Sequence, residues 1–175
     1  RKRPDIEIVG DDFHPLAKVK DFSPYASKIK ASGADTVVTG NWGSDLALLI
    51  KAGKDAGVTA NYYTYYAPTT GVPTAMGAAG AGRVKYIGYF GPNTKGNPAQ
   101  ADQIYDGFMK KYNDDFYMIA AYTGIAMVSQ AFKATHSTDP LKVVRALEGM
   151  KTQSLNGMEE MRASDHQLQQ PLVIT

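Results

Sequence analysis

Two aromatic turns carry the side chains of this chain that are best suited to binding a small molecule. The first turn consists of Asn41, Trp42 and Gly43 and follows a predicted strand over residues 35–40. The second consists of Tyr65, Tyr66 and Ala67 and ends the next predicted strand. Ligands of open α/β sheets bind outside the carboxyl ends of the strands, where both turns are expected. An aromatic face can hold an apolar or cationic ligand, and exposed helix N-terminal amides can hold a carboxylate.

Core packing is the competing explanation for each aromatic residue. Tyr63 and Tyr65 alternate onto one face of their strand, and this position favours burial in the core. For Trp42 and Tyr66 the pattern favours contact with a ligand. We therefore expect Tyr63 and Tyr65 to be buried in the core, and Trp42 and Tyr66 to contact a ligand.

Other kinds of chemistry find little support in the chain. His14, His136 and His166 lack ligand-like spacing, so no metal site is predicted. The chain has no cysteine, which excludes disulfides and thiolate chemistry. The glycine-rich residues 77–82 follow a helix and precede a strand, the reverse of a phosphate-binding loop. No cofactor is predicted.

No catalytic residue is predicted either. The Gly-x-Ser-x-Gly pattern of a nucleophile elbow is absent. Ser44-Asp45 is typical of a helix cap, and Ser164-Asp165-His166 is interpreted as a turn because neighbouring side chains of an extended chain point in opposite directions. We therefore expect a protein that is not an enzyme.

Composition narrows the range of partners. The 175 residues are 43% hydrophobic, and 19 basic and 17 acidic residues give a formal charge of +2. This balance favours neither nucleic acid nor an anionic membrane surface. The longest apolar stretch, residues 116–128, is shorter than the ~20 residues of a membrane span, so direct membrane insertion is not predicted.

The first half of the chain alternates between strand and helix. Strands are predicted at residues 6–9, 35–40, 61–65 and 84–89. Helices are predicted from Ser23 as N-cap to Gly33, and at residues 45–56 and 72–79. This alternation predicts an α/β fold, a parallel sheet with helices on both faces.

The second half has a different pattern. After a polar linker at residues 92–98, helices are predicted at residues 99–112, 117–135 and 141–148, the last capped by Asp139-Pro140. A hairpin turn at Asn156-Gly157 and an extended segment at residues 168–175 follow. The helices have wide apolar faces and almost no strands to cover, so we expect them to need a sheet from elsewhere.

The chain resembles the second half of the type I periplasmic solute-binding proteins, which include the leucine/isoleucine/valine-binding branch of ABC importers. The stretches "KDFSPYASKIKASGAD", "GNWGSDLALLIKAGKDAG" and "MRASDHQLQQPLVI" carry most of the match. The resemblance implies three regions: a second-lobe α/β domain at 1–93, helices of an incomplete first lobe at 94–152, and a hairpin and strand region at 153–175 near the inter-lobe crossover.

The resemblance also implies a function. Such a protein is periplasmic or extracytoplasmic, captures a small solute between two closing lobes and delivers it to a membrane permease. The turns 41–43 and 65–67 match second-lobe contacts. Amino-acid binders commonly carry an acid in the second turn, and here there is none, which favours a carboxylic or aromatic acid over an α-amino acid.

The resemblance also has consequences for the isolated chain and leaves other functions open. A chain with one wall of the cleft is expected to bind little alone, and exposed first-lobe helices favour a non-native dimer. The same fold serves as a ligand-sensing domain of regulators or receptors, which remains an alternative function. An enzyme on an α/β scaffold is the third class.

Overall fold

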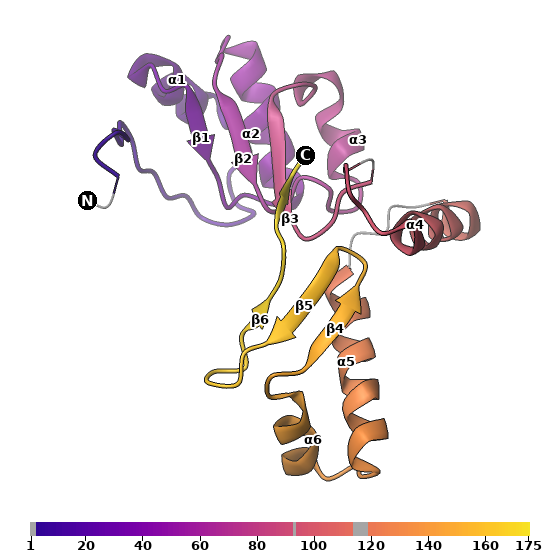
Figure 1. Ribbon diagram of the computed structural model, residues 1–175. Coiled ribbons are helices and arrows are strands. Elements are labelled where there is room, and N and C mark those ends of the chain that lie inside the picture. Colours follow the sequence, from indigo (N-terminus) through magenta and orange to yellow (C-terminus); the bar gives the residue numbers. More distant parts are fainter. Residues whose placement is uncertain (1–2, 93, 114–118) are drawn as a thin grey trace. The chain divides into compact units, whose positions relative to one another are not determined.

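The computed structural model describes residues 3–92, 94–113 and 119–175, and the chain divides into two compact units, Arg1–Ile87 and Gly88–Thr175 (Figure 1). The elements that begin in unit 1 are α1 (Ser23–Ser32), β1 (Thr36–Val38), α2 (Gly43–Asp55), β2 (Asn61–Thr64), α3 (Val72–Met76), a 3-10 turn η1 (Gly77–Ala79) and β3 (Val84–Gly88).

The three strands of unit 1 are parallel, which confirms the α/β class. β1 pairs with β2 in the register Val38 to Tyr63, and β2 pairs with β3 in the register Tyr62 to Val84. A helix connects each strand to the next along the chain (Figure 1). Consecutive strands therefore end at the same edge of the sheet, as the sequence predicted.

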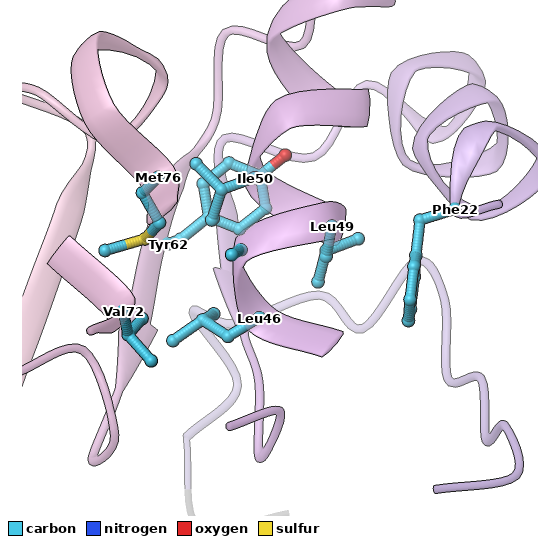
Figure 2. Close-up of a cluster of buried hydrophobic side chains, with 8 residues drawn as sticks. Phe22, Leu46, Leu49, Ile50, Tyr62, Val72 and Met76 are labelled. Carbon is cyan, nitrogen blue, oxygen red and sulfur yellow. The ribbon is translucent and has the colours of Figure 1, made fainter. Parts of the chain in front are cut away.

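The core of unit 1 forms between the helices and one face of this sheet (Figure 2). Leu46, Leu49 and Ile50 recur at helical spacing along α2 and are all buried. Tyr62 is the tyrosine of β2 that joins them, with 3% of its surface exposed. The prediction of a buried Tyr65 is wrong: Tyr65 lies beyond the last strand residue and is 54% exposed.

Helix boundaries differ from the predictions at two N-termini. Ser23 is the first residue of α1 rather than its cap, and the Asp21 Oδ1 atom accepts a hydrogen bond from the Ser23 N–H at 2.8 Å. α2 begins at Gly43, two residues before the predicted start. Gly33 ends α1 in the left-handed conformation with φ 69°, as predicted.

The predicted strand at residues 6–9 is wrong. These residues form no strand, and they are exposed to solvent. A strand needs a hydrogen-bonded neighbour, and no described strand pairs with this segment. Alternation of Ile and Glu indicated a half-buried strand but could not supply its partner.

We expect the hydroxyl of Tyr62 to destabilise the core. It is buried without a hydrogen-bond partner among the described residues. A side chain at Gly53 would collide with it. Tyr62→Phe should therefore raise the free energy of unfolding by about 1 kcal/mol.

A double-mutant cycle in urea checks this assignment. Gly53→Ala should destabilise the wild type and should do so less in the Tyr62→Phe background, because the colliding oxygen is gone. Equal effects of Gly53→Ala in both backgrounds would show that the contact does not limit packing.

Unit 2 has a different architecture. Its elements are α4 (Ala99–Tyr112), α5 (Ile119–Thr135), α6 (Pro140–Leu147), β4 (Lys151–Ser154), β5 (Gly157–Met161), β6 (Leu168–Gln169) and β7 (Val173–Ile174). β4 and β5 form the predicted Asn-Gly hairpin, and β6 extends it into an antiparallel sheet. The Asp139 Oδ1 atom caps α6 by accepting from the Leu141 N–H at 2.9 Å. The predicted start of α5 at Tyr117 lies outside the described residues.

The expectation that these helices lack strands to contact is corrected for α5. The Gln130 side chain on α5 donates to the Thr152 Oγ1 atom of β4 at 2.7 Å. Met127 and Ala131 of α5 are buried. The hairpin that follows the helices in sequence therefore contacts one side of α5.

Apolar side chains elsewhere on α5 and α6 stay exposed. Ile125 and Leu141 are each 72% exposed. The same group includes Tyr122, Val128, Phe132 and Val144. These six residues are called here the open apolar face.

Glu159 is a buried acid on β5. Its Oε1 atom accepts from the Ser154 hydroxyl at 2.8 Å, and its Oε2 atom has no hydrogen bond of ordinary geometry among the described residues. Burial raises the pKa of this carboxyl, and the side chains of Ser154, Thr123 and Asn156 oppose the rise. Desolvation is the larger effect.

The stability of the chain should therefore depend on the ionisation of Glu159. A folded-state pKa above the unfolded value means that the stabilisation is complete below the unfolded pKa and is lost as the pH rises through the folded pKa. Glu159→Gln should remove this loss, so that the variant gains stability relative to the wild type as the pH rises from acid to neutral.

Urea unfolding at acid and neutral pH measures the difference. Glu160→Gln is the matched control, because Glu160 is a more exposed neighbour that pairs with Lys151 at 3.4 Å. The control should keep the pH dependence of the wild type. A pH dependence that survives in Glu159→Gln would assign it to another group.

Candidate functional site

The ends of β1 and β2 are built in the same way. The Asn41 N–H donates to the Thr39 Oγ1 atom at 3.1 Å, and the Tyr66 N–H donates to the Thr64 Oγ1 atom at 3.2 Å. The Thr39 N–H also donates to the Tyr63 carbonyl at 3.0 Å, which continues the parallel pairing. A hydroxyl two residues before each turn residue therefore fixes both turns.

These two turns present aromatic side chains to solvent. Trp42 is 50% exposed, and Tyr65 and Tyr66 are 54% and 40% exposed. Ala67, by contrast, is buried. Because β1 and β2 are adjacent and parallel, the structure brings the two turns to one edge of the sheet.

Gly43 has a backbone role at the start of α2. Trp42 is extended, with φ −140° and ψ 166°, and Gly43 has a φ of 56°. A left-handed residue of this kind is nearly free of strain only as glycine. The chain turns sharply from β1 into α2 here, which leaves the Trp42 ring at the turn.

Asp45 has a different role from the predicted helix cap. Its side chain lies inside the first turn of α2 and is 2% exposed. The Oδ2 atom accepts from the Ala17 N–H at 2.8 Å. A carboxylate is favourable near a helix N-terminus, and here it also ties the loop of residues 10–21 to α2.

His14, for which no role was predicted beyond the absence of a metal site, belongs to the same loop. It is only partly exposed, and its Nε2 atom lies 2.8 Å from the Asn41 Oδ1 atom. Its ring meets Phe22 and Tyr25 edge-on, at centroid distances of 5.0 and 5.6 Å. No spacing signal could have revealed this contact, because the two residues are 27 positions apart.

The adjacent Ser164, Asp165 and His166 do not form a catalytic group. Asp165 pairs with Arg162 at 2.5 Å, and His166 Nε2 lies 3.3 Å from the Glu148 carboxylate. Residues 163–165 form a turn, as predicted. Among the described residues there is no cluster of three metal-ligating side chains.

A shallow depression in unit 2 includes Met158, Gln169 and Pro171 in its lining. None of the predicted site residues line it.

Unit 1 is an α/β lobe whose parallel strands present two ordered turns at one edge of the sheet. A family model described as periplasmic binding protein matches residues 2–175. The chain belongs to this family, whose members are extracytoplasmic binding proteins. Among the described helices, none has the length and apolar character needed to cross a bilayer.

Individual relatives agree with this assignment. The chain is 31% identical to the Leu/Ile/Val-binding protein homolog 4 of Brucella abortus, over 96% of this chain and 41% of that protein. It is similar in structure to a leucine-, isoleucine-, valine-, threonine- and alanine-binding protein from Brucella ovis, solved in a closed conformation. That match has a TM-score of 0.85 and 30% identity, and covers 96% of this chain and 44% of the other.

A Rhodopseudomonas palustris solute-binding protein, solved with 4-hydroxybenzoate, shares the fold. The TM-score is 0.77 at 22% identity, with coverage of 95% of this chain and 47% of that one. The chain thus spans less than half the length of each of these relatives.

The tie between Asp45 and the loop should contribute measurably to stability. Asp45→Ala leaves the Ala17 N–H without its acceptor and is expected to cost about 1–3 kcal/mol. Asp55→Ala is the control, because Asp55 is the exposed last residue of the same helix. Removing an acid there should be neutral or mildly stabilising.

Chemical unfolding and amide exchange measure these effects together. Asp45→Ala should also speed exchange of the Ala17 amide, which a general loss of helix α2 would not do selectively. Unchanged exchange at Ala17 would contradict the assigned hydrogen bond.

Proposed function

We propose that this chain is part of the substrate-binding component of an ABC importer. In this role it captures a small solute, an amino acid or a carboxylic or aromatic acid, in a cleft between two lobes. Unit 1 supplies one wall of that cleft through residues 41–43 and 65–67. The family membership, and relatives named for binding amino acids, support this function.

One observation carries the proposal. Trp42 and Tyr66 are exposed at the ends of adjacent parallel strands, on turns that Thr39 and Thr64 fix by the same hydrogen bond. Exposing large aromatic side chains on ordered turns leaves apolar surface in water, which a bound solute would cover. A turn that only connected strand and helix would gain nothing from them.

The solute class follows from the charges near these turns. Residues 65–67 contain no acid that could pair with an ammonium group. Asp45 is close in sequence to the first turn, but its carboxylate is buried and its Oδ2 atom is used by the Ala17 N–H. The described turns therefore favour a solute whose recognised group is a carboxylate or an aromatic ring over one that depends on an ammonium group.

The second wall is proposed to come from a partner lobe beyond these residues. The open apolar face needs cover, and the relatives are more than twice as long as the part that this chain matches. The relative solved in a closed conformation fits a cleft that closes around its solute. The binding protein would then deliver its solute to a membrane permease from the extracytoplasmic side.

This role needs neither a catalytic group nor a cofactor. The side chains fit retention of a solute rather than its conversion. Exposed first-lobe helices remain a reason to expect a non-native dimer when the chain is isolated.

A solute screen on the complete protein that carries this chain tests the proposal. Leucine, benzoate and 4-hydroxybenzoate are added separately, and the unfolding temperature is recorded. A solute at 100 times its Kd should stabilise by about 2.7 kcal/mol. We expect the aromatic acids to give larger shifts than leucine.

Calorimetric titration of variants then tests the site. Trp42→Ala should weaken binding roughly tenfold, since a stacked aromatic contact contributes about 1 kcal/mol or more. Tyr112→Ala is the matched control, because Tyr112 is similarly exposed but lies on α4 in unit 2. Equal effects of the two substitutions, or no shift with any solute, would refute the proposal.

A further inference from the structure

The imidazole of His14 is tightly placed for a residue in a loop. Phe22 and Tyr25 meet it edge-on at 5.0 and 5.6 Å, and each ring nitrogen lies near an oxygen. Nε2 is 2.8 Å from the Asn41 Oδ1 atom, and Nδ1 is 3.3 Å from the Pro15 carbonyl. The shorter contact is the one that reaches the candidate binding turn.

The chemistry of the two groups decides where the proton lies. A carboxamide oxygen can only accept, so the 2.8 Å contact requires an N–H on Nε2. A neutral imidazole has one N–H, and the longer contact with the Pro15 carbonyl is the weaker competitor for it. An imidazolium would also donate from Nε2. Both forms give the same bond to Asn41.

This bond leaves the other end of the Asn41 amide available. The backbone N–H of Asn41 is already used by Thr39, so the residue is fixed at two points. No described residue accepts a hydrogen bond from its Nδ2 atom, and Asn41 is only partly exposed. Nδ2 therefore remains an available donor on the residue that precedes Trp42.

We propose that His14 is a positioning residue for solute recognition. It donates Nε2–H to the Asn41 oxygen and so keeps the Asn41 amide nitrogen as a donor for an oxygen of the solute, a carboxylate or a carbonyl. The inference rests on the proposed function, in which the turn of residues 41–43 contacts the solute. His14 itself does not touch the solute in this arrangement.

The alternative arrangement has the opposite specificity. If Nδ1–H donated to the Pro15 carbonyl, Nε2 would accept from the Asn41 nitrogen, and the amide oxygen would become the free end. The turn would then favour a donor such as an ammonium group. The histidine tautomer thus decides which end of the amide meets the solute.

Nitrogen-15 NMR of the imidazole rings tests the tautomer in the complete protein. Spectra are recorded at alkaline pH, and the loss of signals in His14→Gln assigns them. We expect the proton on Nε2. His136→Asn, at a left-handed position that Asn tolerates, should leave the His14 signals unchanged. A proton on Nδ1, or rapid exchange between the tautomers, overturns the inference.

Binding of benzoate, measured by calorimetry, tests the consequence. His14→Phe preserves an aromatic ring against Phe22 and Tyr25 but cannot donate, and should weaken binding about tenfold. His14→Gln retains a donor and should stay within about threefold of the wild type. Asn41→Asp replaces the donor with a second acceptor oxygen and should weaken binding further than His14→Phe.

The outcomes separate the inference from the proposed function. If the wild type binds benzoate and His14→Phe binds it equally well, only the role of His14 fails. Equal losses in His14→Phe and His14→Gln would likewise assign a packing role to the residue. If the wild type binds neither benzoate, 4-hydroxybenzoate nor leucine, the proposed function fails and the inference fails with it.

Discussion

The packing of α2 against β2 is the contact on which unit 1 depends. Tyr62 fits beside Gly53 because that position has no side chain, and Leu46 and Ile50 close the same core. This contact sets where α2 begins relative to the strands. The turn that connects β1 to α2 must therefore be short and sharp, which the left-handed Gly43 permits. The exposed position of Trp42 is a consequence of packing behind it.

Much of the fold could be predicted because its signals are local. Residues 35–40 are rich in β-branched side chains, α2 repeats its apolar residues at helical spacing, and Asn156-Gly157 marks a hairpin. The predictions that failed concern structure that depends on a contact with a residue far away in the sequence. Residues 6–9 alternate as a strand would, yet no described strand pairs with them.

The position of the candidate site at the strand ends could be predicted from the sequence, but the contacts that hold its residues could not. Strand-helix alternation placed Trp42 and Tyr66 at strand ends, whereas a shift of one residue along β2 decides which tyrosine is buried. Tyr62, rather than Tyr63 or Tyr65, joined the core. His14 and Asp45 each contact residues that are 27 or 28 positions away, so their short-range sequence patterns indicated only a loop and a cap.

The hydrogen bond between Asp45 and Ala17 affects how the sequence of the loop of residues 10–21 can change between related proteins. Its donor is a backbone N–H, so the bond depends on the backbone conformation at position 17 and not on a particular side chain. Ala17 adopts a left-handed φ of 55°, which glycine or asparagine would also tolerate. Loop sequences can therefore drift while their attachment to α2 persists. Proteins that share this tether can acquire new side chains next to the turn of residues 41–43 without rebuilding the helix behind it.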